Sequence, residues 1–227
     1  MGAYVVIDPG HGGKDSGATG FGLNEKDVVL ELSKKINDHF GKYQDVTVSL
    51  TRWDDRFIEL NERADFANKR NCDLFISIHN NSASPSANGF ESYIHPNASS
   101  STVRYQDEIH KHIMQYLTQY QIHDRGKKQA NFAVLRETSM PAILLENLFI
   151  SNQRENELLR DSSFLDGLAN AIVEGVASVF QLRKKPAMYR ITVDGQAVYD
   201  TAYESKIVDA VLEAVRKHAQ EIQLKKL

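Results

Sequence analysis

Apolar, strand-like segments alternate with amphipathic, helix-like segments from the start of this 227-residue chain to about residue 182. Strands that alternate with helices pack into a largely parallel sheet, because each helix carries the chain back across one face of that sheet. We therefore predict an α/β fold over residues 1–182, a three-layer sandwich with a mostly parallel twisted sheet. The expected strands are residues 4–7, 46–50, 74–78, 89–94, 133–135 and 142–145.

The helix-like segments have recognisable beginnings and ends. Asn24 is expected to cap a helix that Gly41 ends, and Asp54 or Asp55 is expected to open a second helix. A third helix should follow a polar loop over residues 97–102, and its apolar face should include Ile109 and Ile113. The last two helices of this domain are expected over residues 152–161 and from Ser162 or Ser163 to Phe180.

The pattern breaks at Arg183-Lys184-Lys185-Pro186, which is typical of a linker. Beyond it, Asp194-Gly195 lies between two strand-like runs, residues 189–193 and 197–201, and predicts a β-hairpin. Residues 203–219 should form a helix, and residues 222–224 a further strand. A small α+β C-terminal segment over residues 187–227 is marginal for independent folding. We expect it to bind a partner, and one alternative is a homodimer formed through this segment.

Composition and charge exclude several classes of protein. The net charge is −3 and no basic stretch is interleaved with aromatic residues, so we expect no nucleic-acid partner. Cys72 is the only cysteine, which excludes disulfides and thiolate metal sites and indicates a small buried residue. No apolar run approaches membrane-spanning length, so we expect no membrane insertion.

Two histidines follow apolar runs directly. His11 comes after Tyr4–Ile7 within a glycine-rich turn, and His79 comes after residues 74–76. Two strands that each end in a histidine can direct both imidazoles to one point, as a zinc site requires. A nucleotide-binding loop is a poor alternative for the glycine-rich turn. Its glycines lack the dinucleotide spacing, and no Ser or Thr follows Lys14.

A catalytic zinc site commonly has three protein ligands, often two histidines and one carboxylate. The residues near His11 leave three carboxylates open as the third ligand: Asp8, Asp15 and Glu25.

Five short motifs occur in a fixed order along the chain. They are Ile7-Asp8-Pro9-Gly10-His11-Gly12-Gly13, Asp15-Ser16-Gly17-Ala18, Asn24-Glu25, Ser77-Ile78-His79-Asn80-Asn81 and Pro141-Ala142-Ile143-Leu144-Leu145-Glu146. Together they resemble the zinc-dependent N-acetylmuramoyl-L-alanine amidases of the type 3 family, the cell-wall lytic amidases that include endolysins. The resemblance runs from about Tyr4 to about Phe180.

This resemblance implies the reaction and the roles of individual residues. The family's zinc ligands correspond to His11, Glu25 and His79, and its catalytic glutamate corresponds to Glu146. The implied substrate is peptidoglycan, in which the amide between N-acetylmuramic acid and L-alanine is hydrolysed. Asn81 and Arg63 are weaker candidates for contacts with the substrate, since turn formation and ion pairing are their alternatives.

The resemblance also sets expectations for the C-terminal segment and for the place of action. Residues 187–227 resemble small wall-binding segments of lytic enzymes. No signal peptide precedes the first strand, so we expect a protein that stays in the cytoplasm until lysis releases it onto the cell wall. If a leader has been removed, the protein is secreted. The sequence does not distinguish a phage endolysin from a host or sporulation autolysin.

Two other classes of protein are alternatives. A peptidoglycan-binding protein without activity would lack a ligand or the base, and all four residues are present. A zinc exopeptidase would need additional carboxylates for a second metal ion.

Overall fold

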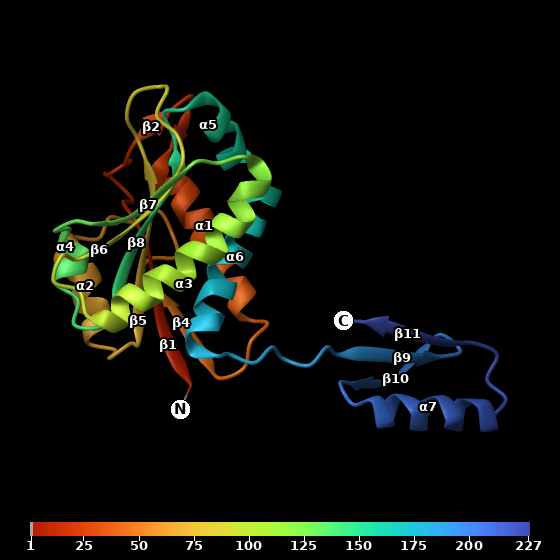
Figure 1. The fold of residues 1–227 in the computed structure, drawn as a ribbon. Helices are drawn as coiled ribbons and strands as arrows, with labels where there is room; N and C mark the ends of the chain where they lie inside the picture. The colour runs from red at the N-terminus through yellow and green to blue at the C-terminus, as the bar shows by residue number, and fades with distance from the viewer. Residues whose placement is uncertain (1) are drawn as a thin grey trace. The chain divides into compact units, whose positions relative to one another are not determined.

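The computed structural model describes residues 2–227 as two compact units, one ending at Arg183 and one spanning Lys184–Leu227. The first unit is built on a six-stranded sheet (Figure 1). The strand order is β4 (Val46–Leu50), β1 (Ala3–Pro9), β5 (Leu74–Asn81), β8 (Ala142–Phe149), β6 (Phe90–Ile94) and β7 (Asp124–Gln129). The first four strands in this order run parallel to one another. Strand β6 is antiparallel to β8, and β7 is parallel to β6.

Helices cover both faces of this sheet and complete the three-layer α/β fold expected from the sequence (Figure 1). One face carries α1 (Glu25–Phe40), α3 (Ser100–Leu117) and α6 (Ser162–Phe180), and the other carries α2 (Leu60–Asn68) and α4 (Ala133–Arg136). The remaining elements are β2 (Thr19–Gly20), β3 (Leu23–Asn24), a 3₁₀ turn (Thr118–Tyr120) and α5 (Gln153–Arg160).

The period of two along each strand produces two separate apolar cores. Val5 and Ile7 of β1 pack in the larger core below α1 and α6, whereas Val6 packs in the smaller core with Phe75 and Leu144. Strands that bury both faces are continuous apolar runs, as β1 and β5 are. Cys72 is buried in the smaller core, as we expected for the only cysteine of the chain.

Helix α6 is long and apolar enough to cross a membrane by length and composition, contrary to the sequence expectation that no such run exists. This is weak support for a membrane span, because 56% of its apolar window is buried inside the protein. Ile172, Val173 and Val176 are fully buried there, in the core shared with α1 and α3. The apolar character of α6 therefore follows from its place in the core.

Two local predictions are wrong, and one strand was not predicted. Residues 133–135 form the short helix α4 and not a strand, because backbone N–H groups of Leu135 and Arg136 bond back to the carbonyl of Phe132. The second helix begins at Leu60, after an extended Glu59, and not at Asp54 or Asp55. The edge strand β7 was not predicted because its sequence, Asp-Arg-Gly-Lys-Lys-Gln, contains no apolar residue.

The C-terminal unit has a three-stranded antiparallel sheet in the order β10 (Gln196–Thr201), β9 (Tyr189–Val193) and β11 (Ile222–Lys226), with the helix α7 (Glu204–Arg216). The predicted hairpin turn lies at Asp194 and Gly195, whose φ angles of 48° and 79° are both positive. Positive φ at both central residues is what a type I′ hairpin turn requires.

Candidate metal centre and active-site groove

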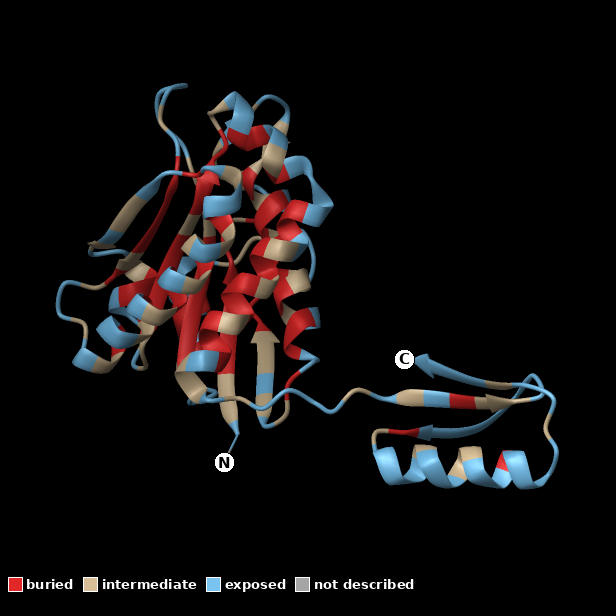
Figure 2. Cartoon of the chain, turned by 45° about the vertical axis from the view of Figure 1, so that its right-hand side comes forward, coloured by how far each residue is buried: buried red, intermediate tan, exposed pale blue. Residues whose placement is uncertain are grey.

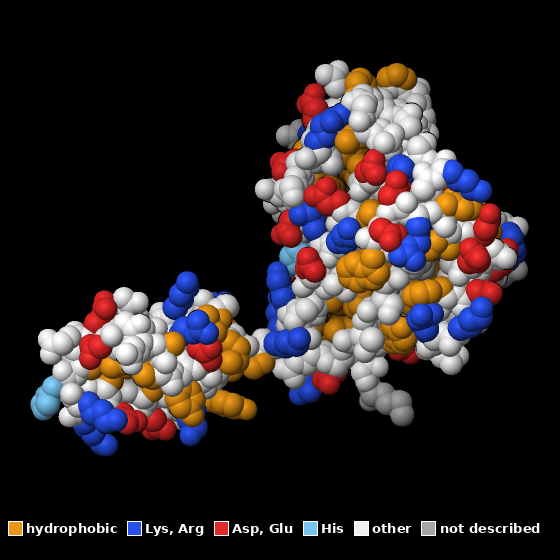
Figure 3. Space-filling model, turned by 180° about the vertical axis from the view of Figure 1, so that it is seen from behind, with side chains coloured by type: hydrophobic (Ala, Val, Ile, Leu, Met, Phe, Trp, Pro, Cys, Tyr) orange, Lys and Arg blue, Asp and Glu red, His pale blue; other side chains and the backbone are white. Residues whose placement is uncertain are grey.

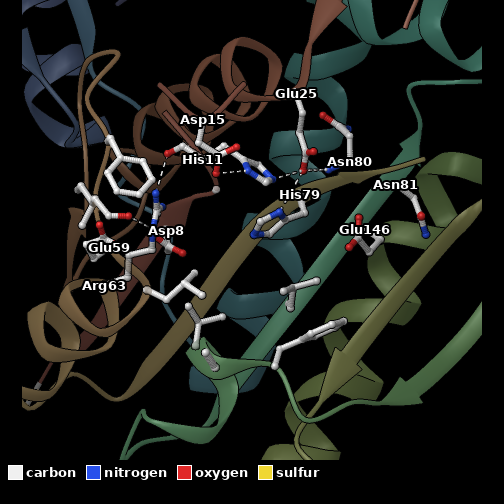
Figure 4. Close-up of a pocket in the computed structure, with 18 of the residues that line it drawn as sticks. Asp8, His11, Asp15, Glu25, Glu59, Arg63, His79, Asn80, Asn81 and Glu146 are labelled. Carbon is white, nitrogen blue, oxygen red and sulfur yellow. Dashed lines mark hydrogen bonds and ion pairs between the residues drawn. The ribbon is translucent and has the colours of Figure 1, made fainter. Parts of the chain in front are cut away.

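The two strand-end histidines meet at the carboxyl edge of the sheet. His11 lies two residues after the end of β1, and His79 lies near the end of β5, which is a parallel neighbour of β1. Glu25 is the first residue of α1, where a carboxylate is favoured by the N-terminal end of the helix. Three separate elements thus bring these three side chains to one point, as Figure 4 shows.

Their donor atoms form a compact set. Glu25 Oε1 lies 3.1 Å from His11 Nε2 and 3.0 Å from His79 Nδ1. The ligand atoms of all three residues lie within 4.8 Å of one another, and the imidazole planes are inclined at 81°. Two imidazole nitrogens and one carboxylate oxygen are a donor set that a divalent transition metal prefers. The cluster could therefore hold one metal ion.

Surrounding groups fix the orientation of each candidate ligand. Asp15 Oδ2 lies 2.8 Å from His11 Nδ1, which leaves His11 Nε2 directed at the cluster. The backbone N–H of Ala18 donates to Glu25 Oε2, and the N–H of Asn80 donates to Glu25 Oε1. A carboxylate on the second nitrogen of a histidine is typical of metal sites, because it sets the tautomer and the ring orientation.

The glycine-rich turn is shaped around these side chains. A Cβ on Gly10 would lie 2.4 Å from Cε1 of His79. A Cβ on Gly17 would lie 2.7 Å from both Glu25 Oε2 and His11 Cδ2, and Gly17 also has a positive φ of 64°. Any larger side chain at either position would occupy space that a candidate metal-ligand side chain fills. This cradle and the donor set both fit a metal ion.

The other two carboxylates are engaged elsewhere. Asp8 is fully buried, and its oxygens accept hydrogen bonds from Thr51, Ser77 and Arg63. Asp15 contacts the outer nitrogen of His11 and not the cluster itself. Of the three carboxylates that the sequence left open, the structure therefore brings Glu25 to both histidines.

The environment keeps Glu25 ionised. Burial raises the pKa of its carboxyl group, but hydrogen bonds and positive charge from His11 and His79 outweigh burial and hold the pKa far below its usual value. Burial lowers the pKa of His11, and the contacts with Glu25 and Asp15 more than reverse that effect. The cluster is thus arranged to favour a positive charge beside an ionised carboxylate.

Glu146 has the opposite environment. It lies opposite His79 in the register of β5 and β8, and its Oε2 atom is buried without a hydrogen-bond partner. Burial raises the pKa of Glu146 to about 7, and the negative charges of Glu25 and Glu91 also raise it. A carboxyl group with a pKa near neutrality and a free buried oxygen can accept and release a proton.

A groove of about 590 Å³ contains the cluster and Glu146. One wall consists of Phe57 to Leu60, the segment before α2, and the other consists of Phe132 to Val134 at α4. Asn80, Asn81 and Ser82, the residues that follow His79 in sequence, also line it. Residues 97–102 do not line this groove, and α3 already begins at Ser100.

Arg63 lines the groove, but its guanidinium group is used within the protein. It is 2% exposed and donates to Asp8 and to the carbonyls of Pro9 and His11. Arg52 likewise donates to the carbonyls of Pro9 and Gly10. These contacts favour a role in positioning the turn that carries His11, and a direct contact between Arg63 and substrate stays a prediction.

Asn81 is held by a buried carboxylate that sequence reasoning did not single out as functional. Its Nδ2 donates to Glu91 Oε1 at 2.6 Å, and its Oδ1 accepts from the N–H of Ser82. Glu91 also accepts from Tyr93, Arg125 and Lys128, and it lies opposite Glu146 in the register of β6 and β8. The only signal in the sequence was the presence of a charged residue within the expected strand 89–94.

A second group of residues has the form of a catalytic triad without the access one needs. His110 Nδ1 lies 2.9 Å from Ser92 Oγ, and His110 Nε2 lies 2.9 Å from Asp124 Oδ1. Ser92 is fully buried and also contacts Gln106. The group therefore connects β6, α3 and β7 and has a structural role.

Comparisons with known proteins agree with this site. Residues 5–178 match the family described as N-acetylmuramoyl-L-alanine amidase, Amidase_3. The endolysin of Bacillus phage SPP1 is 47% identical over 187 residues, which cover 82% of this chain and 69% of that protein. The sporulation-specific N-acetylmuramoyl-L-alanine amidase of Bacillus subtilis is 41% identical over 192 residues, covering 83% of this chain and 73% of that protein.

Solved structures give the same result. An N-acetylmuramoyl-L-alanine amidase from Clostridium difficile 630 is 35% identical with a TM-score of 0.76, covering 79% of this chain and 97% of that one. The catalytic domain of CwlV from Paenibacillus polymyxa is 36% identical with a TM-score of 0.75, covering 80% and 99%. The chain therefore belongs to the N-acetylmuramoyl-L-alanine amidase family of peptidoglycan hydrolases.

Proposed function

We propose that His11, Glu25 and His79 hold one zinc ion and that Glu146 is the general base that cleaves the amide between N-acetylmuramic acid and L-alanine. One observation carries this proposal: a carboxylate with one buried oxygen that has no hydrogen-bond partner lies beside a His-Glu-His cluster in a groove. An unpaired buried polar atom costs stability, so its presence favours a functional role.

Zinc is the metal that the donor chemistry favours. Two imidazoles and a carboxylate with room for a further ligand are the usual protein contribution to a catalytic zinc site. A zinc ion held there would supply Lewis acidity, which lowers the pKa of water and polarises the scissile carbonyl group. Asp15 would keep the Nε2 atom of His11 free for the metal by occupying Nδ1.

Glu146 would move the proton. Its ionised form accepts a proton from the attacking water, and its protonated form passes that proton to the amine of the departing L-alanine. The raised pKa, about 7, suits both steps because each form is accessible near neutral pH. Glu25 cannot share this task, since its low pKa keeps it ionised.

The groove suits a long polymeric substrate. Its walls at Phe57–Leu60 and Phe132–Val134 are largely apolar, and polar residues such as Asn80, Asn81 and Ser82 also line it. Asn81 would contact the substrate at one end with the hydrogen-bonding capacity that Glu91 and Ser82 leave unused.

The C-terminal unit would direct the enzyme to the cell wall. Family similarity ends at residue 178, and the unit contributes no residue to the groove. We further propose that the protein stays in the cytoplasm until lysis releases it, the case that the phage relative suggests, with secretion as the alternative.

Metal content and product chemistry test the proposal together. The purified chain should contain about one zinc ion per protein, and stripping the metal with a chelator should abolish activity until zinc is restored. Digestion of purified peptidoglycan should release stem peptides with a free N-terminal alanine, which mass analysis identifies. Activity that survives complete metal removal would exclude the metal site, and cleavage at another bond would exclude the reaction.

Substitution Glu146→Gln separates the base from the ligands. The variant should bind zinc and melt as a folded protein, but turnover should fall by roughly 10²–10⁴-fold, as expected when an acid–base group is lost. Glu157→Gln, at an exposed position on α5, is the matched control and should leave turnover unchanged. Loss of zinc from Glu146→Gln would show that Glu146 is a ligand.

A further inference from the structure

Helix α7 of the C-terminal unit carries an apolar stripe that nothing within the unit covers. Val208, Leu212 and Val215 are 49%, 49% and 59% exposed. Their spacing of four and then three residues places them on one face of the helix. Ala214 is buried and lies on a different face of the helix, whereas most of α7 is exposed (Figure 2).

The unit has few other means of stability. Within Lys184–Leu227 the buried residues are Ile191, Thr201 and Ala214. Apolar side chains reach its surface instead, as the orange atoms of Figure 3 show. A unit of this size with so small a core gains stability from covering an apolar surface.

The sheet of the unit is less suited to self-association than the helix. A bulge between Ala197 and Tyr199 interrupts the edge strand β10. The other edge strand, β11, ends in Lys225 and Lys226. Bulges and lysines at edge strands disfavour edge-to-edge pairing. The exposed stripe on α7 is therefore the stronger contact surface.

The stripe is complementary to itself when two helices run antiparallel. With Leu212 facing Leu212 of a second copy, Val208 comes beside Val215 of that copy, because these residues lie four before and three after Leu212. The 13-residue helix is about 20 Å long, so the stripe extends over most of it. A two-fold axis through Leu212 thus closes the interface with one patch on each copy.

Charges beside the stripe favour the same arrangement. Asp209 and Arg216 each follow a stripe residue directly, so both lie on the same flank of the stripe, two turns apart. Among residues 2–227 neither side chain has an ion-pair or hydrogen-bond partner, and they are too far apart along the helix to pair with each other. Antiparallel pairing places Asp209 beside Arg216 of the second copy, and this contact occurs twice.

From these observations we infer that the chain forms a homodimer in which α7 pairs antiparallel with α7 of a second copy about Leu212. A single helix pair buries less than the roughly 800 Å² per partner of a standard interface. The dissociation constant should therefore be about 1–100 µM. The dimer would carry two C-terminal units, and their combined attachment to a repetitive wall would exceed that of one. The dimer itself does not depend on the zinc chemistry.

Sedimentation equilibrium of the full chain measures this association. Leu212→Asp should weaken dimerisation by at least roughly a hundredfold, because it introduces two facing carboxylates at the centre of the contact. Leu224→Asp, at a residue of β11 that is 53% exposed, is the matched control and should leave the dimer intact.

Charge exchange distinguishes this pairing from any other contact. Asp209→Arg and Arg216→Glu should each weaken dimerisation by roughly tenfold, because each places like charges together twice. An equimolar mixture of the two variants should associate again, since each copy then supplies the charge that the other lacks. Lys206→Glu, elsewhere on α7, is the control for charge and should have no effect.

Three results would overturn the inference: a chain that is monomeric at 1 mM by sedimentation, a dimer that Leu212→Asp does not affect, or variants that fail to associate when mixed. A further outcome is a chain that is always monomeric and in which Leu212→Asp lowers binding to purified walls. That result would identify the stripe as a wall-contact surface and would equally exclude the dimer.

Discussion

Two glutamates in one groove have opposite protonation behaviour, and their surroundings explain the difference. Glu25 accepts backbone hydrogen bonds and contacts two histidines, which lowers its pKa in spite of burial. Glu146 has one buried, unpaired oxygen, and burial together with the negative charges of Glu25 and Glu91 raises its pKa to about 7. Paired groups whose pKa values are driven apart are typical of a ligand or stabiliser beside a proton carrier.

The raised pKa of Glu146 predicts a pH-dependent stability of the metal-free protein. The folded state holds the proton more tightly than the unfolded state, so this group stabilises folding below about pH 4.5. That stability is lost as pH rises through about 7. The glutamine of the Glu146→Gln variant cannot ionise. The free energy of unfolding of the variant minus that of the parent should therefore be roughly 3 kcal/mol larger at pH 8 than at pH 4.

Chemical denaturation in the presence of a chelator measures this difference. Groups that do not interact with Glu146 are common to both proteins, so their contributions cancel when the two stabilities are subtracted. A constant difference between pH 4 and pH 8 would show that the pKa of Glu146 is not raised in the folded protein.

At the scale of elements, the sequence predicted those features that depend on apolar periodicity. Strands β1, β5 and β8 and helices α1, α3 and α6 lie where their patterns placed them, because each buries a continuous or periodic apolar face. The meeting of His11 and His79 followed from the rule that the carboxyl ends of adjacent parallel strands share one edge.

Features that depend on long-range contacts were not predictable in this way. Strand β7 lacks apolar residues and exists because β6 supplies its hydrogen bonds. Residues 133–135 are too few for their period to distinguish a helix from a strand. The contacts of Glu91 with Asn81, Arg125 and Lys128 join segments that only the folded sheet brings together.

The segment that was wrongly predicted as a strand supplies one wall of the groove, which leads to a prediction about substrate binding. Phe132, directly before α4, is 39% exposed, lines the groove and packs on Tyr93 with ring centres 5.3 Å apart. Phe132→Ala should raise KM for peptidoglycan fragments by roughly tenfold through lost apolar contact, and zinc content should stay the same.

Val103→Ala is the matched control, because Val103 is also 39% exposed but lies on α3 and outside the groove. Equal KM values for the two variants would show that the α4 wall does not contact the substrate. A fall in kcat with unchanged KM in Phe132→Ala would instead indicate a role in positioning the catalytic groups.

At the scale of the whole molecule, the candidate metal-binding and catalytic residues all lie in one of the two units. All the residues of the metal cluster, Glu146 and the groove walls belong to the unit that ends at Arg183. The unit Lys184–Leu227 contains a single histidine, His218, which is exposed. Its most prominent features are its exposed apolar side chains, which are typical of a surface that contacts a partner.

This division predicts the behaviour of a chain that ends at Arg183. It should fold, bind zinc and cleave a small soluble muramoyl-peptide with nearly unchanged kcat/KM, because no groove residue is removed. Lysis of intact walls should fall by roughly 10²-fold or more at low enzyme concentration, since attachment raises the effective concentration of enzyme at its substrate. High enzyme concentration should restore much of this loss. If the shortened chain stays folded but no longer cleaves the soluble substrate, the C-terminal unit takes part in catalysis. If wall lysis is unchanged at every concentration, the unit does not direct the enzyme to the wall.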